Sequence, residues 1–265
     1  MKLRKILPLG LLLLLLCGCG AEPDPTTPPT EATQPPTEEV TQPPIVETVP
    51  STDAPTDPAH WEFFLPDLSV EDVIDYFSEV CLGAEFINSG DPSLLQRWEE
   101  TIYYSIEGEP TEKDLEVIES LAQWLNTVEG FPGMEASPDP EHTNLNIYFC
   151  DQEELIQRLG DNFQNTDGGV TFWYQDDIIF KAIICIRTDL DQELRNSVIL
   201  EELYNGLGPI QDTALREDSI IWAEFSQPQA LTPVDELILR LLYHPSLSCG
   251  MNDAACAEAI RQLYR

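Results

Sequence analysis

The sequence has few basic residues and only three histidines. It carries 13 Lys and Arg against 48 Asp and Glu, which gives a formal net charge of −35. No stripe of Lys or Arg is present that could neutralise phosphates, so we expect no nucleic-acid partner, and anionic lipid head groups would be repelled. Cationic partners and divalent ions are compatible with this charge, and so is an acidic surface that is merely solvated.

Common catalytic and cofactor motifs are missing as well. The chain has no Gly-x-Ser-x-Gly, no P-loop, no Cys-x-x-Cys and no Cys/His pair at zinc-finger spacing. Residues 165–169 mimic part of a calcium loop, but the spacing of oxygen donors and the closing glutamate fail, so a turn is the better prediction. His60, His142 and His244 are scattered along the chain. We therefore predict no cofactor.

The apolar run Ile6–Leu16 is too short to span a bilayer comfortably, since a spanning helix needs about 20 residues. A short basic head at residues 2–5 precedes the run. This order and length are typical of an export signal peptide.

The residues after the run indicate the type of signal. Leu16-Cys17-Gly18-Cys19 resembles the lipobox of bacterial lipoproteins, in which a leucine and two small residues precede an invariant cysteine. The resemblance implies a signal peptide over residues 1–18, cleavage before Cys19 and diacylglycerol on its sulfur. Two or more acyl chains then anchor the protein to the extracytoplasmic face of the cell membrane, because one chain alone binds only marginally.

Residues 19–58 comprise this cysteine and a tether rich in Pro, Thr and Glu. Residues 20–58 contain 11 of the 22 prolines and no Lys, Arg or aromatic residue. Such a segment cannot bury enough apolar surface to offset chain entropy, so we expect disorder, with an extended reach on the order of 120 Å. It is predicted to be a spacer that crosses the cell wall, and a glycosylated stalk is the sharper alternative.

Five cysteines remain after the two of the lipobox are removed or lipidated, and an exported chain can form disulfides. Cys249 and Cys256 are the best candidate pair, because a turn and the start of a helix lie between them. Cys81, Cys150 and Cys185 are expected to be buried apolar thiols.

Residues 59–265 are long enough for one globular domain with a substantial core. Capping boxes or acidic starts predict helices that begin near Ser69, Thr111, Asp151 and Thr188. Strands are predicted at residues 101–106, 146–150, 170–174 and 178–187, with the last two joined as a hairpin through residues 175–177. Strands in the first half and helices to the end predict an α+β fold.

The helix near residues 189–207 carries the most informative residues. It is apolar on more than one side, so it should be mostly buried at the centre of the domain. Glu201 and Asn205 lie four residues apart on one face, with Glu202 beside them. A buried carboxylate must be paired, hydrogen-bonded or protonated, so both glutamates are candidate functional residues.

Residues 201–208 (Glu-Glu-Leu-Tyr-Asn-Gly-Leu-Gly) resemble the helix of zincin metallopeptidases, His-Glu-x-x-His-x-x-Gly, with both histidines replaced. Four later segments resemble a bacterial domain of unknown function that is distantly related to these peptidases: residues 218–220, 231–235, 241–245 and 250–251. The resemblance is good over residues 180–265 and loose over 65–180. It implies a zincin-like α+β fold with an active-site-like helix and a helical C-terminus.

The peptidase chemistry needs two imidazoles one helical turn apart to hold zinc, and a glutamate that takes a proton from metal-bound water. By position, the resemblance makes Glu202 the general base and gives the two ligand positions to Glu201 and Asn205. Gln211 stands where a third ligand often lies, and Asp212 follows it. Oxygen donors favour harder ions than zinc, so this set is a poor zinc site.

Two classes of function follow from the sequence. The first is a surface-anchored, non-catalytic binding or scaffold domain on a degenerate peptidase-like fold, with an extracytoplasmic protein or cell-wall partner. The second is a hydrolase that uses Glu202 as general base, with or without a hard divalent ion held by Glu201, Asn205 and Asp212. The sequence favours the first, because each replaced ligand weakens metal binding.

Overall fold

The computed structural model describes residues 2–5, 65–83, 94–223 and 228–265. The apolar run, the lipobox with Cys19, the tether and His60 lie outside these described residues. Among the described helices, none has both the length and the apolar character needed to cross a membrane.

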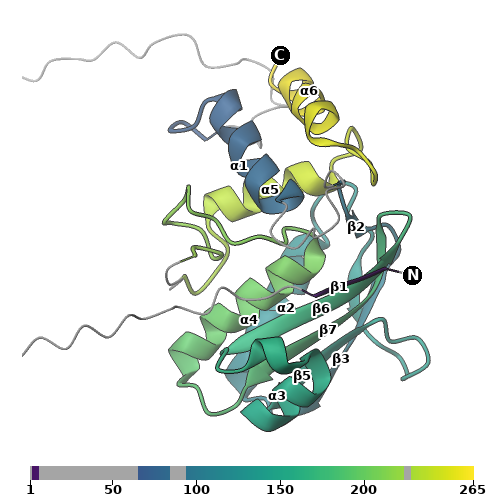
Figure 1. Ribbon diagram of the computed structural model, residues 1–265, viewed down its shortest axis with the longest axis vertical. Coiled ribbons are helices and arrows are strands. Elements are labelled where there is room, and N and C mark those ends of the chain that lie inside the picture. The colour runs from purple at the N-terminus through teal and green to yellow at the C-terminus, as the bar shows by residue number, and fades with distance from the viewer. Residues whose placement is uncertain (1, 6–64, 84–93, 224–227) are drawn as a thin grey trace, which may run out of the picture. The chain divides into compact units, whose positions relative to one another are not determined.

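The described strands form one seven-stranded sheet in the order β1-β6-β7-β5-β3-β4, and β2 also pairs with β7 (Figure 1). Strand β7 pairs in parallel with β2 and β5, and β3 pairs in parallel with β4 and β5. Strand β6 is antiparallel to both β1 and β7. The strands are β1 Lys2–Lys5, β2 Arg97–Trp98, β3 Ile102–Gly108, β4 Met134–Ala136, β5 Leu145–Cys150, β6 Gly168–Gln175 and β7 Ile178–Arg187.

Helices and strands alternate in the first part of the described chain. Parallel neighbours cannot be joined by a tight turn and need crossover connections, which places helices between the strands. A mixed helix-and-strand domain is therefore confirmed. Helices also lie between the strands, and the regular elements after the last strand, which ends at Arg187, are helices, as expected. The α-helices are α1 Val70–Leu82, α2 Glu112–Leu125, α3 Gln152–Leu159, α4 Gln192–Leu207, α5 Pro233–Tyr243 and α6 Asp253–Leu263.

The hairpin between β6 and β7 is confirmed. Asp176 and Asp177 form its two-residue turn with φ angles of 52° and 62°. A hairpin turn with both central residues at positive φ matches the twist of its flanking strands, and Asp tolerates this conformation better than most residues.

Two of the three predicted capping boxes are present, and the third is wrong. The side chains of Ser69 and Thr111 cap α1 and α2, each reciprocated by the aspartate three residues later. Helix α4 instead begins after Asp191, whose carboxylate accepts a hydrogen bond from the Leu194 amide at 3.0 Å. The Thr188 amide donates to Cys150 O, so Thr188 is held at the end of β5 and cannot cap α4.

The two faces of the sheet pack against different helices. In β7, Ile184 and Ile186 belong to the main core, which also contains the apolar residues of α4. Cys185, between them, belongs to a smaller cluster with Cys150 and the α3 residue Leu155. This alternation follows from the period of two along a strand.

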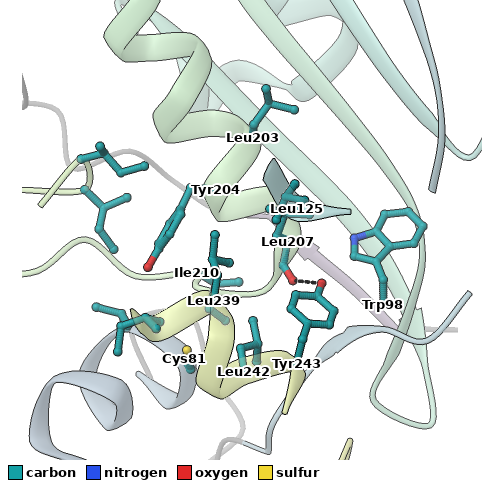
Figure 2. Packing of buried hydrophobic residues seen from close by; sticks show 14 of the residues in the cluster. Cys81, Trp98, Leu125, Leu203, Tyr204, Leu207, Ile210, Leu239, Leu242 and Tyr243 are labelled. Atoms are coloured by element: carbon teal, nitrogen blue, oxygen red, sulfur yellow. Dashed lines mark hydrogen bonds between the residues drawn. The ribbon is translucent and has the colours of Figure 1, made fainter. Parts of the chain in front are cut away.

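The C-terminal end of α4 is fixed inside the main core. Tyr243 Oη donates to Leu207 O at 2.8 Å, and Trp98 Nε1 donates to Gly206 O at 2.9 Å (Figure 2). The last carbonyls of a helix have no partner within the helix, so a buried end needs such donors. Residues from β2 and α5 therefore hold the segment that resembles the zincin helix.

Candidate functional site

The structure brings the predicted residues together on the second half of α4. Glu202 is 5% exposed and Asn205 is 4% exposed, whereas Glu201 is only partly buried. The predicted burial of this helix is confirmed. Glu202, in the general-base position, therefore has little contact with solvent.

A glycine at the start of β6 allows the sheet to lie close to Glu202. A Cβ atom at Gly168 would come within 2.6 Å of Val198 Cγ1 and 3.0 Å of Glu202 Cγ. A larger residue there would force the side chains of Val198 and Glu202 to move. The sequence pattern predicted a turn at Gly168 and gave no sign of this contact. Asn165, with a φ of 67°, does occupy a turn conformation.

Burial and like charges favour the protonated forms of Glu201 and Glu202. Burial raises the pKa of Glu202 well above its usual range, and Glu201 and Asp212 add to the shift. Burial raises the pKa of Glu201 to about 8, with further contributions from Asp212 and Asp167. Both carboxyls therefore favour the neutral form more than an ordinary glutamate does, and Asp212 is near enough to contribute to the shift of each.

Asn205 and Gln211 each have a buried side-chain oxygen without a hydrogen-bond partner. Gln211 packs against the end of α1, where any side chain larger than glycine at Gly83 would collide with its Oε1 atom. Asn205 lies one helical turn after Glu201. Of these two amides, Asn205 is thus the one that shares a helix face with the glutamates.

No group of three or more His, Cys, Asp or Glu side chains within the described ranges is arranged to hold a metal ion. His142 Nδ1 lies 2.8 Å from Asp139 Oδ1 in an exposed loop. His244 follows α5 as its C-cap residue, and its Nδ1 accepts a hydrogen bond from the Ser246 amide at 3.1 Å. Neither of these histidines lies in the α4 segment that would need them.

The five described cysteines are free thiols. Cys81, Cys150 and Cys185 are buried, as predicted. Cys249 Sγ lies 3.5 Å from Glu99 Oε1, and Cys256 lies in the core close enough to Cys81 to raise the pKa of that thiol further. The pairing of Cys249 with Cys256 stays a prediction.

A cavity that the sequence pattern did not predict lies beside α4. It has a volume of about 670 Å³. Its lining comes from α2, α4, the segment 229–231 and the first turn of α5. In the sequence, the one hint of this cavity is Trp124, an aromatic residue at a partly exposed position of α2. The lining residues are Lys113, Glu116, Val117, Ser120, Leu121, Trp124, Asn196, Leu200, Gln229, Ala230, Leu231 and Glu236.

These features define a mixed α/β domain whose central helix carries two glutamates with raised pKa values and a buried amide. Residues 70–262 match the family described as protein of unknown function (DUF2927), and the chain belongs to that family. No curated protein and no solved structure matches the chain.

Proposed function

We propose that this DUF2927 protein is a lipid-anchored, extracytoplasmic binding module with a zincin-like ancestry and no peptidase activity. The observation that carries this proposal is the burial of Glu202. A general base must reach the water or group from which it takes a proton. Glu202 is 5% exposed and lies beneath β6, next to the backbone of Gly168.

The ligand positions support the same proposal. Glu201 and Asn205 stand where a zincin helix presents two imidazoles, and neither side chain is a good zinc ligand. Because α4 is buried in the core without such ligands, we assign it a structural role. The binding function then belongs to other parts of its surface.

One observation favours a second candidate, a hydrolase that uses Glu202 with a hard divalent ion. Asn205 Oδ1 is buried and has no hydrogen-bond partner, and the partly buried Glu201 lies one turn before it. Amide and carboxylate oxygens are ligands that Mg²⁺ and Ca²⁺ accept. Asp212, whose charge acts on both glutamates, is the third oxygen donor of this alternative.

Metal analysis and a hydrolysis assay distinguish the two candidates. The purified chain is expected to contain no stoichiometric zinc, and to cleave neither casein nor a mixed peptide library with or without added Zn²⁺, Mg²⁺ or Ca²⁺. Glu202→Gln is the matched variant, because it keeps the shape of the side chain. Cleavage that requires a divalent ion and is lost in Glu202→Gln would establish the hydrolase, and stoichiometric zinc would also contradict our proposal.

The anchor has a separate test. Cys19→Ser removes the sulfur that would carry the lipid, so the protein is expected to move almost entirely from the membrane fraction to the soluble extracellular or periplasmic fraction. Metabolic labelling with a fatty acid should mark the wild type and not Cys19→Ser, while the neighbouring variant Cys17→Ser should keep the label. Fatty-acid label that persists in Cys19→Ser would show that this residue does not carry the lipid.

Leader cleavage would also change the sheet. Strand β1, Lys2–Lys5, lies within the proposed signal peptide and pairs with residues 171–174 of β6. Its removal leaves β6 at the edge of the sheet, with unpaired backbone groups along one side. The mature domain is therefore expected to contain the sheet β6-β7-β5-β3-β4 with β2.

A further inference from the structure

The cavity beside α4 has the size and the apolar lining of a small-molecule binding site. Its volume of about 670 Å³ falls within the range typical of small-molecule pockets. Val117 and Leu121 of α2, Leu200 of α4 and Leu231 supply apolar lining. Three of these side chains are nearly or fully buried, so this part of the wall belongs to the rigid core.

An aromatic ring completes the apolar lining. Trp124 lies near the end of α2, and the Arg240 guanidinium of α5 stands 5.3 Å from its ring centroid. This cation–π contact restrains the indole from the α5 side. The ring is therefore presented to the cavity in a defined orientation, as an anchor for an apolar body.

Hydrogen bonds hold the opposite wall in place. Asn196 Nδ2 donates to Gln229 Oε1 at 3.0 Å, and Gln192 Nε2 donates to Asn196 Oδ1 at 2.8 Å. Gln229 Nε2 also donates to Ser197 Oγ at 3.0 Å. These hydrogen bonds fix the segment 229–231 to α4. A preformed cavity costs less ordering free energy on binding than one that must open.

The charges that line the cavity are nearly balanced, so the acidic charge of the whole chain is what favours a cationic ligand. Glu116 of α2 and Glu236 of α5 lie in its lining with one cation, Lys113, which is 3.0 Å from Glu116. The second cation nearby, Arg240, is held by Glu236 and the Trp124 ring. The whole chain carries a net charge of −35, so its field attracts cations and repels anions.

We infer that this cavity binds a small amphiphilic cation, a molecule with an aliphatic or aromatic body and a positively charged amine. The body would pack on Trp124 and Leu200, and the amine would lie towards Glu116 and Glu236. The inference rests on the proposed function in that it treats the domain as a binding module, and it adds the site and the class of ligand.

Three probes of nearly equal shape test the inference on the full-length mature protein: 4-phenylbutylamine, 4-phenylbutanol and 4-phenylbutyrate. Isothermal titration calorimetry gives each affinity. The amine is expected to bind with a Kd below about 1 mM and about tenfold more tightly than the carboxylate, with the alcohol between them. Equal affinities for amine and carboxylate, or no binding of the amine, would overturn the inference.

Matched variants locate the binding. Ser120→Phe places a ring into the cavity from an exposed position of α2 and should weaken amine binding about tenfold or more, whereas Gln123→Phe, on α2 outside the lining, should not. The double variant Glu116→Gln/Glu236→Gln should reduce the preference for amine over alcohol, and Glu119→Gln, also outside the lining, should keep it. Binding unaffected by Ser120→Phe would place the amine elsewhere. These assays use neither hydrolysis nor metal, so their failure leaves the proposed function standing, and peptidase activity would not remove the site.

Discussion

Replacing Arg195 with methionine is expected to lower the free energy of unfolding by about 3–5 kcal/mol, because it leaves a buried carboxylate without its cation. Asp114 is 0% exposed, and Arg195 Nε donates to its Oδ1 atom at 3.0 Å. Burial alone would raise the pKa of Asp114, but hydrogen bonds from Thr111, Gln192 and Arg195 outweigh it and lower that pKa. The carboxylate is therefore charged in the folded protein and needs these donors.

The same contact joins α2 to α4. Arg195 Nη1 also donates to Thr188 O at 2.9 Å, so one guanidinium holds the start of α4, the start of α2 and the end of β7. Urea unfolding followed by circular dichroism measures the loss. Arg261→Met is the control, because Arg261 forms an exposed ion pair with Glu71 at 2.7 Å, which solvent screens, so its loss should have little effect.

A double-mutant cycle separates the contribution of the ion pair from that of side-chain packing. If pairing causes the loss, Arg195→Met should cost much less in an Asp114→Asn background than in the wild type. Equal costs in both backgrounds would mean that packing of the long side chain, and not the charge, makes Arg195 important.

Local signals in the sequence were sufficient for the features that depend on a few adjacent residues. The Thr111 capping box, which positions Asp114, and the turn at Asp176 and Asp177 fall in this class. Thr188 has an equally good local pattern, yet it is held by Cys150 of β5 and α4 begins at Gln192. A contact across the sheet outweighed a capping preference of about 1 kcal/mol.

Features that join distant segments could not be predicted. The parallel order β7-β5-β3-β4 depends on pairing between strands separated by helices, and periodicity does not encode which strands are neighbours. The partner of Asp114 lies in another helix. The cavity is built from α2, α4 and α5, and only Trp124 signals it locally.

The candidate site likewise has some features that local spacing predicts and others that depend on tertiary contacts. The spacing along α4 was enough to place Glu201 and Asn205 on one face and to predict that Glu202 is buried. The close approach of Gly168, which confines Glu202, joins a strand to a helix and gave no signal beyond a glycine pair that a turn also explains. The chemistry of Glu202 therefore depended on tertiary structure.

The raised pKa values of Glu201 and Glu202 make the stability of this domain depend on pH. A carboxyl whose pKa is raised in the folded state binds more protons folded than unfolded, so stability decreases as the pH rises. Its contribution is complete below the unfolded pKa near 4.5 and is lost as the pH rises towards the folded value, which for Glu201 is about 8. The wild-type domain should therefore be more stable at about pH 5 than at about pH 8.

Glu202→Gln should remove much of this dependence, because glutamine has nearly the same shape and no proton to lose. We expect the variant to exceed the wild type at about pH 8 by about 1–3 kcal/mol and to differ little from it at about pH 5. Urea unfolding at both pH values measures the effect, with Glu119→Gln on the exposed side of α2 as the control. If Glu202→Gln were instead less stable than the wild type at about pH 8, Glu202 would be ionised and held by a donor in the native protein. A charged Glu202 would restore the property that a general base requires, so this measurement also bears on the choice between binding module and hydrolase.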